Sequence, residues 1–528
     1  MKKRMRAPAA LLAALLFLAS CAKQAPTPEE TAPPAAVSSA EELPTEGQTL
    51  QPGEEETPAD AVKDAAAETE APETEAAVPE QESPSSHADP GLAARYLEEA
   101  VEYAKTIREL YWDGDTLLSS LTPQGGTPHL WPYTEQAGMV NGILLAMDRE
   151  HPDRAYFEEY LRELMEGFRR YRVKRVKMTG NETWNRPENF IAEYGTSDGS
   201  ENSYAIYSSS RLDKRMDAAI VTPDAVYFDD NVWVAKEFYY AWRNLGDMAY
   251  LNEAANIMNW ILGEGYEGAG ALGGIYWKWS AKFRFDGGNY SDSNHASLNA
   301  CSTASSAMVL GHLIPAVAGT ELEGLRAGYL EKAESIFRFS TEAYVDRGTR
   351  CLYDKVFLKK GFEGQTELKK QIEKTDQSQY AYNTGTYLEA GVLLARIARE
   401  EGWDAEEYLT RVSASAAGAD KKFADRSGGK GAASYPSHSW FTSFLVSGFS
   451  AAAEEDEAAE AYVESMRESL DWAWEHFRAQ DGLVSPAWVK GWTRFSNNSP
   501  DSEDNPRQIL YQSANAHCYA MLAQYYGK

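Results

Sequence analysis

One spacing governs most of the chain after residue 90: apolar residues recur every three or four positions, stretch after stretch. In 231–246, Val234, Phe238 and Ala241 fall on one face of a helix. The same rhythm recurs in eleven other stretches: 91–111, 134–149, 154–172, 251–261, 295–316, 322–341, 381–400, 404–418, 439–453, 457–478 and 508–526. About twelve helices in six hairpins, without the sustained alternation of a large sheet, predict an all-α fold, an (α/α)6 barrel.

The first residues have a different character. A basic start, M-K-K-R-M-R, precedes a short apolar run that ends in Leu-Ala-Ser-Cys at 18–21. The run is too short for a permanent membrane span and has the form of a signal peptide. It resembles a bacterial lipoprotein signal, which implies removal of residues 1–20 and lipidation of Cys21. An ordinary secretory signal is the alternative.

Residues 21–90 are rich in Pro, Ala, Glu, Thr and Ser and contain no Trp, Tyr or Phe. From 22 to 90 there are 17 acidic residues and 2 lysines. Such a segment cannot bury enough apolar surface to offset its ordering entropy, so it is predicted to be a disordered tether. It would hold a catalytic domain, residues 91–528, away from the membrane. We therefore expect a protein of the bacterial cell envelope that faces outward and is anchored by its lipid alone.

Composition narrows the possible partners. The formal net charge is −29, and without a basic block the chain is a poor candidate for binding nucleic acid. The cysteines that follow the signal, Cys301, Cys351 and Cys518, have neither disulfide-framework nor metal-ligand spacing and are predicted to be buried thiols. The eight histidines form no H-E-x-x-H motif. We expect no metal, no cofactor and a monomer.

Two adjacent acids stand out at 227–233, which reads Y-F-D-D-N-V-W. Asp229 and Asp230 precede a helical pattern, so one interpretation is helix N-capping. The other is chemical, because glycosidic bonds are commonly cleaved by two carboxyl groups. Neighbouring side chains at a helix start suit the short separation of a retaining enzyme, and their repulsion favours holding one proton between them.

Long connections between the helices carry many aromatic residues. They span 112–133, 173–229, 263–294, 342–380 and 479–507, and they include Trp112, Trp131, Trp184, Trp277, Trp279, Trp488 and Trp492. Long loops in a compact domain tend to carry function, and flat aromatic faces suit sugar rings. The connections therefore predict a binding surface.

The motif at 227–233 resembles the active-site motif of glycoside hydrolase family 76, the endo-α-1,6-mannanases, which is usually written Y-Y-D-D-N-x-W. Four later features resemble the family in the same order: L-G-D-M-A-Y-L at 245–251, G-G-I-Y-W at 273–277, Asn299, and Y-N-T-G at 382–385. The resemblance covers most of 91–528 and implies an (α/α)6 barrel.

The family resemblance also implies a function: retaining hydrolysis of α-1,6-mannosidic linkages in α-mannan. By matched position, Asp229 is the nucleophile and Asp230 the acid/base. Substrate-binding candidates are Tyr227, Asn231, Tyr382 and Asn383, with Trp131 and Trp277 for stacking on sugars. The substrate would be a polysaccharide or oligosaccharide.

The chain departs from the family at Phe228, where Tyr is usual, at Thr384, where Gln is usual, in S-W-F-T-S-F at 439–444, and by an insertion at 174–222. Two other functions stay open. One is a surface lipoprotein that binds glycans without cutting them, which would not need adjacent carboxyls. The other is a different (α/α)6 enzyme, such as an unsaturated-uronyl hydrolase, for which Arg211, Lys214 and Arg215 could bind the substrate carboxylate.

Overall fold

The computed structural model describes residues 87–112, 114, 126–178, 190–193, 204–212, 220–283, 296–429, 431–435, 439–492 and 505–528. Contacts divide the chain into two units, Met1–Ser83 and Pro84–Lys528, and every described residue belongs to the second. The predictions for the signal peptide, Cys21, the tether as far as residue 86, Trp184, Lys214 and Arg215 lie outside the described residues.

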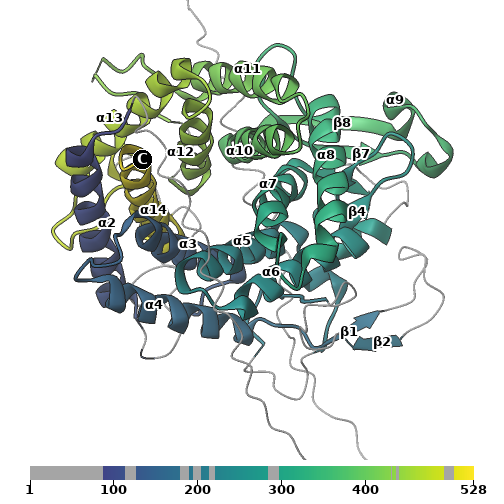
Figure 1. Cartoon of the computed structure of the whole chain (residues 1–528), viewed down its shortest axis with the longest axis horizontal. Coiled ribbons are helices and arrows are strands. Elements are labelled where there is room, and N and C mark those ends of the chain that lie inside the picture. Colours follow the sequence, from purple (N-terminus) through teal and green to yellow (C-terminus); the bar gives the residue numbers. More distant parts are fainter. Residues whose placement is uncertain are drawn as a thin grey trace, which may run out of the picture. The chain divides into compact units, whose positions relative to one another are not determined.

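The second unit is built as a double ring of helices (Figure 1). Each inner helix contacts the next around a closed circle, and the last of them packs on the first. The inner ring is α3 (Leu130–Ala146), α5 (Phe228–Leu245), α7 (Ala300–Val317), α10 (Ala381–Glu400), α12 (Ser439–Ala453) and α14 (Ile509–Tyr526). The outer ring is α2 (Pro90–Tyr111), α4 (Arg154–Gly167), α6 (Met248–Trp260), α8 (Arg326–Ala343), α11 (Glu406–Phe423) and α13 (Glu460–Phe477). The predicted (α/α)6 barrel is confirmed.

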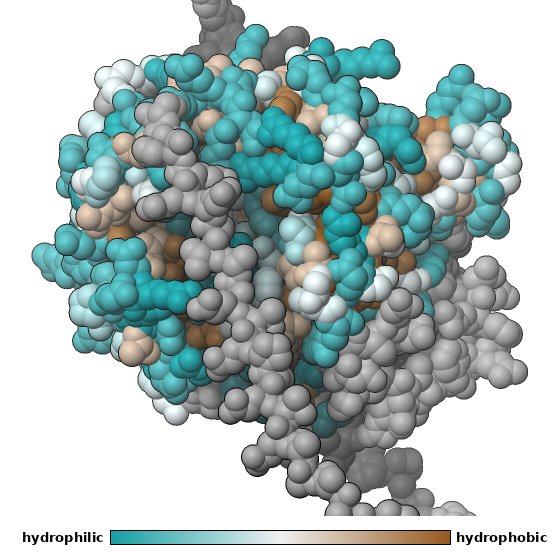
Figure 2. All heavy atoms as spheres, in the orientation of Figure 1, coloured by the Kyte–Doolittle hydropathy of each residue, from teal (hydrophilic) through white to brown (hydrophobic). Residues whose placement is uncertain are grey.

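The sequences of the two rings differ because their surroundings differ. Outer helix α4 buries one stripe, Phe157, Tyr160, Leu161, Leu164 and Met165, and turns polar residues outward. Inner helix α14 is buried over almost its whole length. Hydrophilic side chains cover much of the visible face (Figure 2).

Outer and inner helices alternate along the chain. All six inner helices therefore run in the same direction, and their N-termini gather at one end of the barrel.

The long connections contain short sheets that the sequence did not predict. One sheet has the order β2 (Phe190–Glu193), β1 (Arg175–Met178), β3 (Ile220–Val221), and a second pairs β4 (Tyr266–Glu267) with β5 (Gly274–Ile275). The third has the order β6 (Ser297–Asn299), β7 (Tyr353–Leu358), β8 (Ile372–Gln379), all antiparallel, and the four-residue α9 (Leu368–Gln371) precedes β8. Because β6 runs directly into α7, the third sheet is attached to the N-terminal end of an inner helix.

Three further features are the apolar helix α7, the three cysteines and the point where the chain joins the barrel. Among the described residues, α7 is long and apolar enough to cross a membrane, but 83% of it is buried inside the protein, as expected for an inner barrel helix. Cys301, Cys351 and Cys518 are buried free thiols, as predicted. The backbone N–H of Asp89 donates to the carbonyl of Tyr526 at 2.8 Å, so the chain enters the barrel at the C-terminal end of α14.

Candidate active site

The aspartate pair lies in the first turn of inner helix α5. The preceding residue, Tyr227, is extended and occupies the N-cap position. Neither aspartate is therefore the N-cap residue, and the capping interpretation is wrong. The backbone N–H of Phe228 donates to the carbonyl of Trp277 at 2.9 Å, so the helix start is joined to the segment that follows β5.

Asn231 and Phe228 hold this turn in place from behind. The Asn231 side chain is fully buried. Its amide oxygen accepts from the Tyr207 N–H at 2.8 Å, and its amide nitrogen donates to the carbonyls of Tyr207 and Tyr227 at 2.9 and 2.7 Å. We therefore assign Asn231 a structural role in place of the predicted substrate contact. The Phe228 ring stacks on Trp260 at 4.6 Å.

The two carboxyls differ in acidity. Burial raises the pKa of Asp229 to about 6, while the nearby Cys301 thiol, the Asp230 backbone N–H and the Trp277 indole favour the charged form and limit the rise. The Trp277 Nε1–H donates to Asp229 Oδ2 at 3.2 Å. Burial, followed by the negative charge of Asp229, raises the pKa of Asp230 well above its ordinary value. At neutral pH the pair therefore holds one proton, on Asp230, beside an ionised Asp229.

Half-buried aromatic rings flank this pair. Tyr227 and Trp277 meet edge to face at 5.1 Å, and the ammonium of Lys278 lies 5.8 and 5.9 Å from their ring centroids. Both predicted residues thus adjoin Asp229. Two other tryptophans predicted for the binding surface, Trp279 and Trp488, are buried in the core instead.

A second aromatic group, here called the aromatic wall, consists of Trp131, Tyr380, Tyr382, Trp440 and Phe441. Trp131 meets Trp440 edge to face at 4.8 Å, and Tyr382 stacks on Phe441 at 4.9 Å. Trp131, Tyr380 and Phe441 are partly exposed, whereas Tyr382 and Trp440 are buried. The wall lies beside the helix that carries the aspartates, because Trp440 meets Trp233 of α5 edge to face at 5.9 Å. Burial, followed by the nearby Cys301, Asp354 and Asp229, raises the pKa of Tyr382.

Several buried polar atoms near the pair have no hydrogen-bond partner among the described residues. They are Asp229 Oδ1, both side-chain polar atoms of Asn383, and Trp131 Nε1. Buried polar groups normally have partners, so this group marks where water or a ligand would be bound. Asn383 and Trp131 belong to the predicted site; their substrate contacts remain predictions.

Sequence reasoning missed Cys301, Asp354, Tyr380, Trp440 and Phe441. A shared position would have found two of them, Cys301 and Trp440. Five site residues are each the second residue of an inner helix, so the starts of five of the six inner helices contribute to the same end of the barrel: Trp131, Asp229, Cys301, Tyr382 and Trp440. Asp354 gave no such signal, since it lies on β7, a strand that the sequence did not predict.

Two residues that differ from those usual in the family are buried and take part in packing or backbone hydrogen bonds. Phe228 is buried against Trp260, and Thr384 is buried with its hydroxyl accepting from the Leu352 N–H at 3.2 Å. The third departure, at 439–444, supplies Trp440 and Phe441 to the aromatic wall.

Within the described part of the chain, no three His, Cys, Asp or Glu residues are grouped as metal ligands.

Residues 221–494 match the family model of glycosyl hydrolase family 76. The matched region is more than half of the chain and contains the aspartate pair. The chain belongs to glycosyl hydrolase family 76. No curated protein matches it in sequence. The predicted family and enzyme class are confirmed, and the protein is a glycoside hydrolase.

Solved structures of family 76 share the fold. A family 76 mannosidase from Bacteroides thetaiotaomicron VPI-5482 is 18% identical with a TM-score of 0.59, over 81% of this chain and 98% of its own. An inactive variant of an α-1,6-mannanase from Salegentibacter sp. HEL1_6, in complex with α-1,6-mannotetraose, is 16% identical with a TM-score of 0.54, over 81% of this chain and 99% of its own. At sequence identities of 16–18%, this similarity shows a shared fold and nothing more specific.

Proposed function

We propose that this protein is a retaining hydrolase that cleaves α-1,6-mannosidic linkages, with Asp229 as nucleophile and Asp230 as acid/base. The observation that carries the proposal is the aspartate pair itself: two adjacent carboxyls at the mouth of the inner ring, with the pKa of Asp229 raised to about 6 and that of Asp230 raised well above its ordinary value. A binding protein has no need of this arrangement, because two partly buried carboxyls that share one site disfavour each other's ionisation.

The relatives support the choice of mannan. Structures named as an α-1,6-mannanase and a family 76 mannosidase share the fold of this chain. The inactive Salegentibacter variant replaces two consecutive aspartates by alanine and is bound to α-1,6-mannotetraose. Asp229 and Asp230 are the consecutive aspartates of the present chain that lie at the inner-helix N-termini.

The acidities of the pair support the following assignment of the steps. Asp230 donates its proton to the glycosidic oxygen, and the bond from that oxygen to the anomeric carbon breaks as the Asp229 carboxylate attacks the carbon. The Trp277 indole N–H and the α5 N-terminus both favour negative charge on Asp229. Asp230, now ionised, takes a proton from water, and the resulting hydroxide displaces Asp229 from the sugar. Two inversions leave the product in the α configuration.

The substrate would lie along the aromatic rings. Trp131 and Phe441 offer exposed apolar surface for sugar rings, and the buried Trp131 Nε1–H is an available donor for a hydroxyl. Tyr227 and Trp277 would contact the sugar that is bonded to Asp229. These contacts remain part of the proposal.

Product analysis tests the reaction. We expect the purified protein to release mannooligosaccharides from debranched α-1,6-mannan, with the α anomer appearing first in NMR spectra and the β anomer only after mutarotation. A β-1,4-linked mannan serves as the control and should stay intact. Initial β product would contradict the retaining mechanism. Retention on immobilised mannan without cleavage would replace the proposal by the glycan-binding alternative.

We also propose that the protein is a monomer in the bacterial envelope, anchored through lipidated Cys21 and facing outward. In support, the backbone N–H of Asp89, just before the first outer helix, donates to the carbonyl of Tyr526, at the end of the inner ring opposite the aspartates. On the described surface the exposed large hydrophobic residues are Tyr156 and Trp403, which form no extended patch for a partner.

We expect Cys21→Ala to move the protein from the membrane fraction to the soluble fraction of cells, because the variant cannot be lipidated at this position. Continued membrane association would contradict lipidation.

A further inference from the structure

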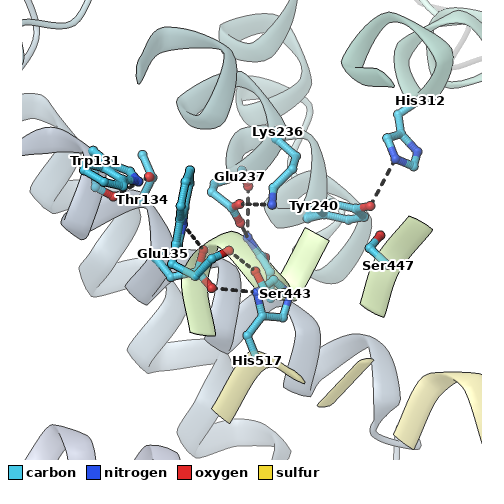
Figure 3. A network of polar contacts seen from close by, with 12 residues as sticks. Trp131, Thr134, Glu135, Lys236, Glu237, Tyr240, His312, Ser443, Ser447 and His517 are labelled. Carbon is cyan, nitrogen blue, oxygen red and sulfur yellow. Dashed lines mark hydrogen bonds and ion pairs between the residues drawn. The ribbon is translucent and has the colours of Figure 1, made fainter. Parts of the chain in front are cut away.

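Inside the barrel, below the aromatic wall, lies a polar cavity of about 80 Å³ lined by residues of all six inner helices. Three nearly buried glutamates line it, and each has a basic partner. Glu135 pairs with His517 at 2.9 Å, Glu237 with Lys236 at 3.1 Å and Glu389 with His312 at 2.8 Å. Figure 3 shows Glu135 beside His517 and Glu237 beside Lys236. Such partners are what a buried carboxylate requires.

The second oxygens of the three glutamates have different partners. Glu237 accepts from the Asn141 amide at 2.9 Å, and Glu389 accepts from the Ser447 hydroxyl. Glu135 Oε2 instead accepts from the indole N–H of Trp440 at 3.1 Å. Glu135 therefore links the polar cavity to the aromatic wall, while the other two glutamates bond to small polar side chains.

Trp440 is at the centre of the wall. Its ring centroid lies 4.8 Å from that of Trp131, 5.3 Å from Phe441 and 5.5 Å from Tyr382. It also contacts Trp233, which follows Asp229 by four residues on the same face of α5. Aromatic pairs prefer edge-to-face or offset contacts, but these contacts do not by themselves set the direction of the indole N–H. A hydrogen bond to a carboxylate is strong and fixes one orientation.

We propose that Glu135 is a positioning residue, which acts through Trp440 to orient the sugar-binding rings of the aromatic wall. His517 holds one carboxylate oxygen and thereby directs the other at the Trp440 N–H. The inference rests on the proposed function of the cleft. Glu135 has no part in proton transfer, so its loss should weaken substrate binding and leave the chemistry of the aspartate pair unchanged.

Steady-state kinetics on α-1,6-mannooligosaccharides test the inference. For Glu135→Ala we expect KM to rise about tenfold while kcat stays within about twofold, since uniform binding is lost. Glu135→Gln keeps an acceptor for Trp440 and should restore KM to nearly the wild-type value. Trp440→Phe removes the donor and should raise KM as Glu135→Ala does. In the double variant the two changes should not add, because both remove one interaction.

Glu389→Ala is the matched control. It removes a buried glutamate from the same cavity, with the same kind of histidine partner, but it does not touch the aromatic wall. It should lower the melting temperature like Glu135→Ala and leave KM unchanged. Equal KM changes in the two variants, additive effects of Glu135→Ala and Trp440→Phe, or an unchanged KM in Trp440→Phe would each overturn the proposal.

An optical measurement separates this inference from the proposed function. The near-ultraviolet circular dichroism of the paired Trp131 and Trp440 indoles should change in Glu135→Ala and be retained in Glu135→Gln and Glu389→Ala. This result is expected whether or not the protein cleaves mannan. A wild-type spectrum for Glu135→Ala would overturn the positioning role, whereas an inactive wild-type protein with the expected spectra would overturn only the proposed function.

Discussion

Replacing either aspartate of the pair by asparagine is expected to abolish hydrolysis of α-1,6-mannan without unfolding the protein. Asp229→Asn removes the nucleophile, so kcat should fall by at least about 10⁴-fold. Asp230→Asn removes the acid/base, for which a loss of about 10²- to 10⁴-fold is expected. Asp404→Asn, an exposed aspartate between α10 and α11, is the matched control and should keep full activity. Rates of sugar release measure all three.

A second substrate distinguishes the roles within the pair. An aryl α-mannooligoside with a phenolate that leaves without protonation needs the nucleophile but no acid. Its first step should proceed at a nearly normal rate in Asp230→Asn and fail in Asp229→Asn. Added azide should then release an α-glycosyl azide from the Asp230→Asn intermediate. The reverse pattern would exchange the two roles.

The pH profile carries the same information. The wild-type kcat/KM should rise through about pH 6 as Asp229 ionises, and fall at a higher pH where Asp230 loses its proton. With the aryl substrate, Asp230→Asn should keep the rising limb and lose the falling one. A falling limb that persists in this variant would mean that another group is the acid.

The thermal stability of Asp229→Asn distinguishes loss of activity from unfolding. The pKa of Asp229 is about 6 in the folded state, above the value of about 3.9 in an unfolded chain. The folded state therefore binds protons more tightly, and stability decreases as the pH rises between these two values. Asparagine cannot ionise, so Asp229→Asn should melt at pH 7 no lower than the wild type. A markedly lower melting temperature would contradict the burial of an ionised Asp229.

The sequence was most informative where local pattern decides structure. The predicted ranges 381–400 and 439–453 coincide with α10 and α12, because their apolar spacing is uninterrupted. Helix α3 begins four residues before its predicted start, and its first turn contains Pro132, a position where proline is tolerated. The three sheets were missed because strands of two to eight residues depend on partners distant in the chain.

The residues of the candidate site also fall into those that the sequence predicted and those that only the folded ring brings together. Asp229, Asp230 and Tyr227 were found because they share one short motif. The aromatic wall beside them comes from three helices, α3, α10 and α12, which are separated by tens of residues and meet only when the ring closes. Cys301 and Trp440 had no local signal of function, and Asn231 was assigned a substrate contact because a motif does not show which of its members face inward. Ring closure is thus the step that creates the site.

The contact between α10 and α12 allows a direct test of that dependence. A Cβ added at Gly385 would lie 2.1 Å from the carbonyl oxygen and 2.3 Å from the carbonyl carbon of Phe444. A Cβ at Gly448 would lie 2.6 Å from the carbonyl oxygen of Gly385. The two backbones meet at this glycine pair, and backbone atoms cannot yield as a flexible side chain does. The Gly of Y-N-T-G is therefore required by helix packing.

We expect Gly385→Ala to lower the free energy of unfolding by about 3 kcal/mol, the upper range for an overpacked core. It should also reduce activity, because separating α10 from α12 moves Tyr382 away from Phe441, which stack at 4.9 Å. Gly328→Ala on outer helix α8 is the matched control: its Cβ meets open space, so it should stabilise the protein by about 0.5–1 kcal/mol. Urea unfolding followed by tryptophan fluorescence measures both. Wild-type stability in Gly385→Ala would show that the inner ring tolerates a wider spacing and that the aromatic wall does not depend on this contact.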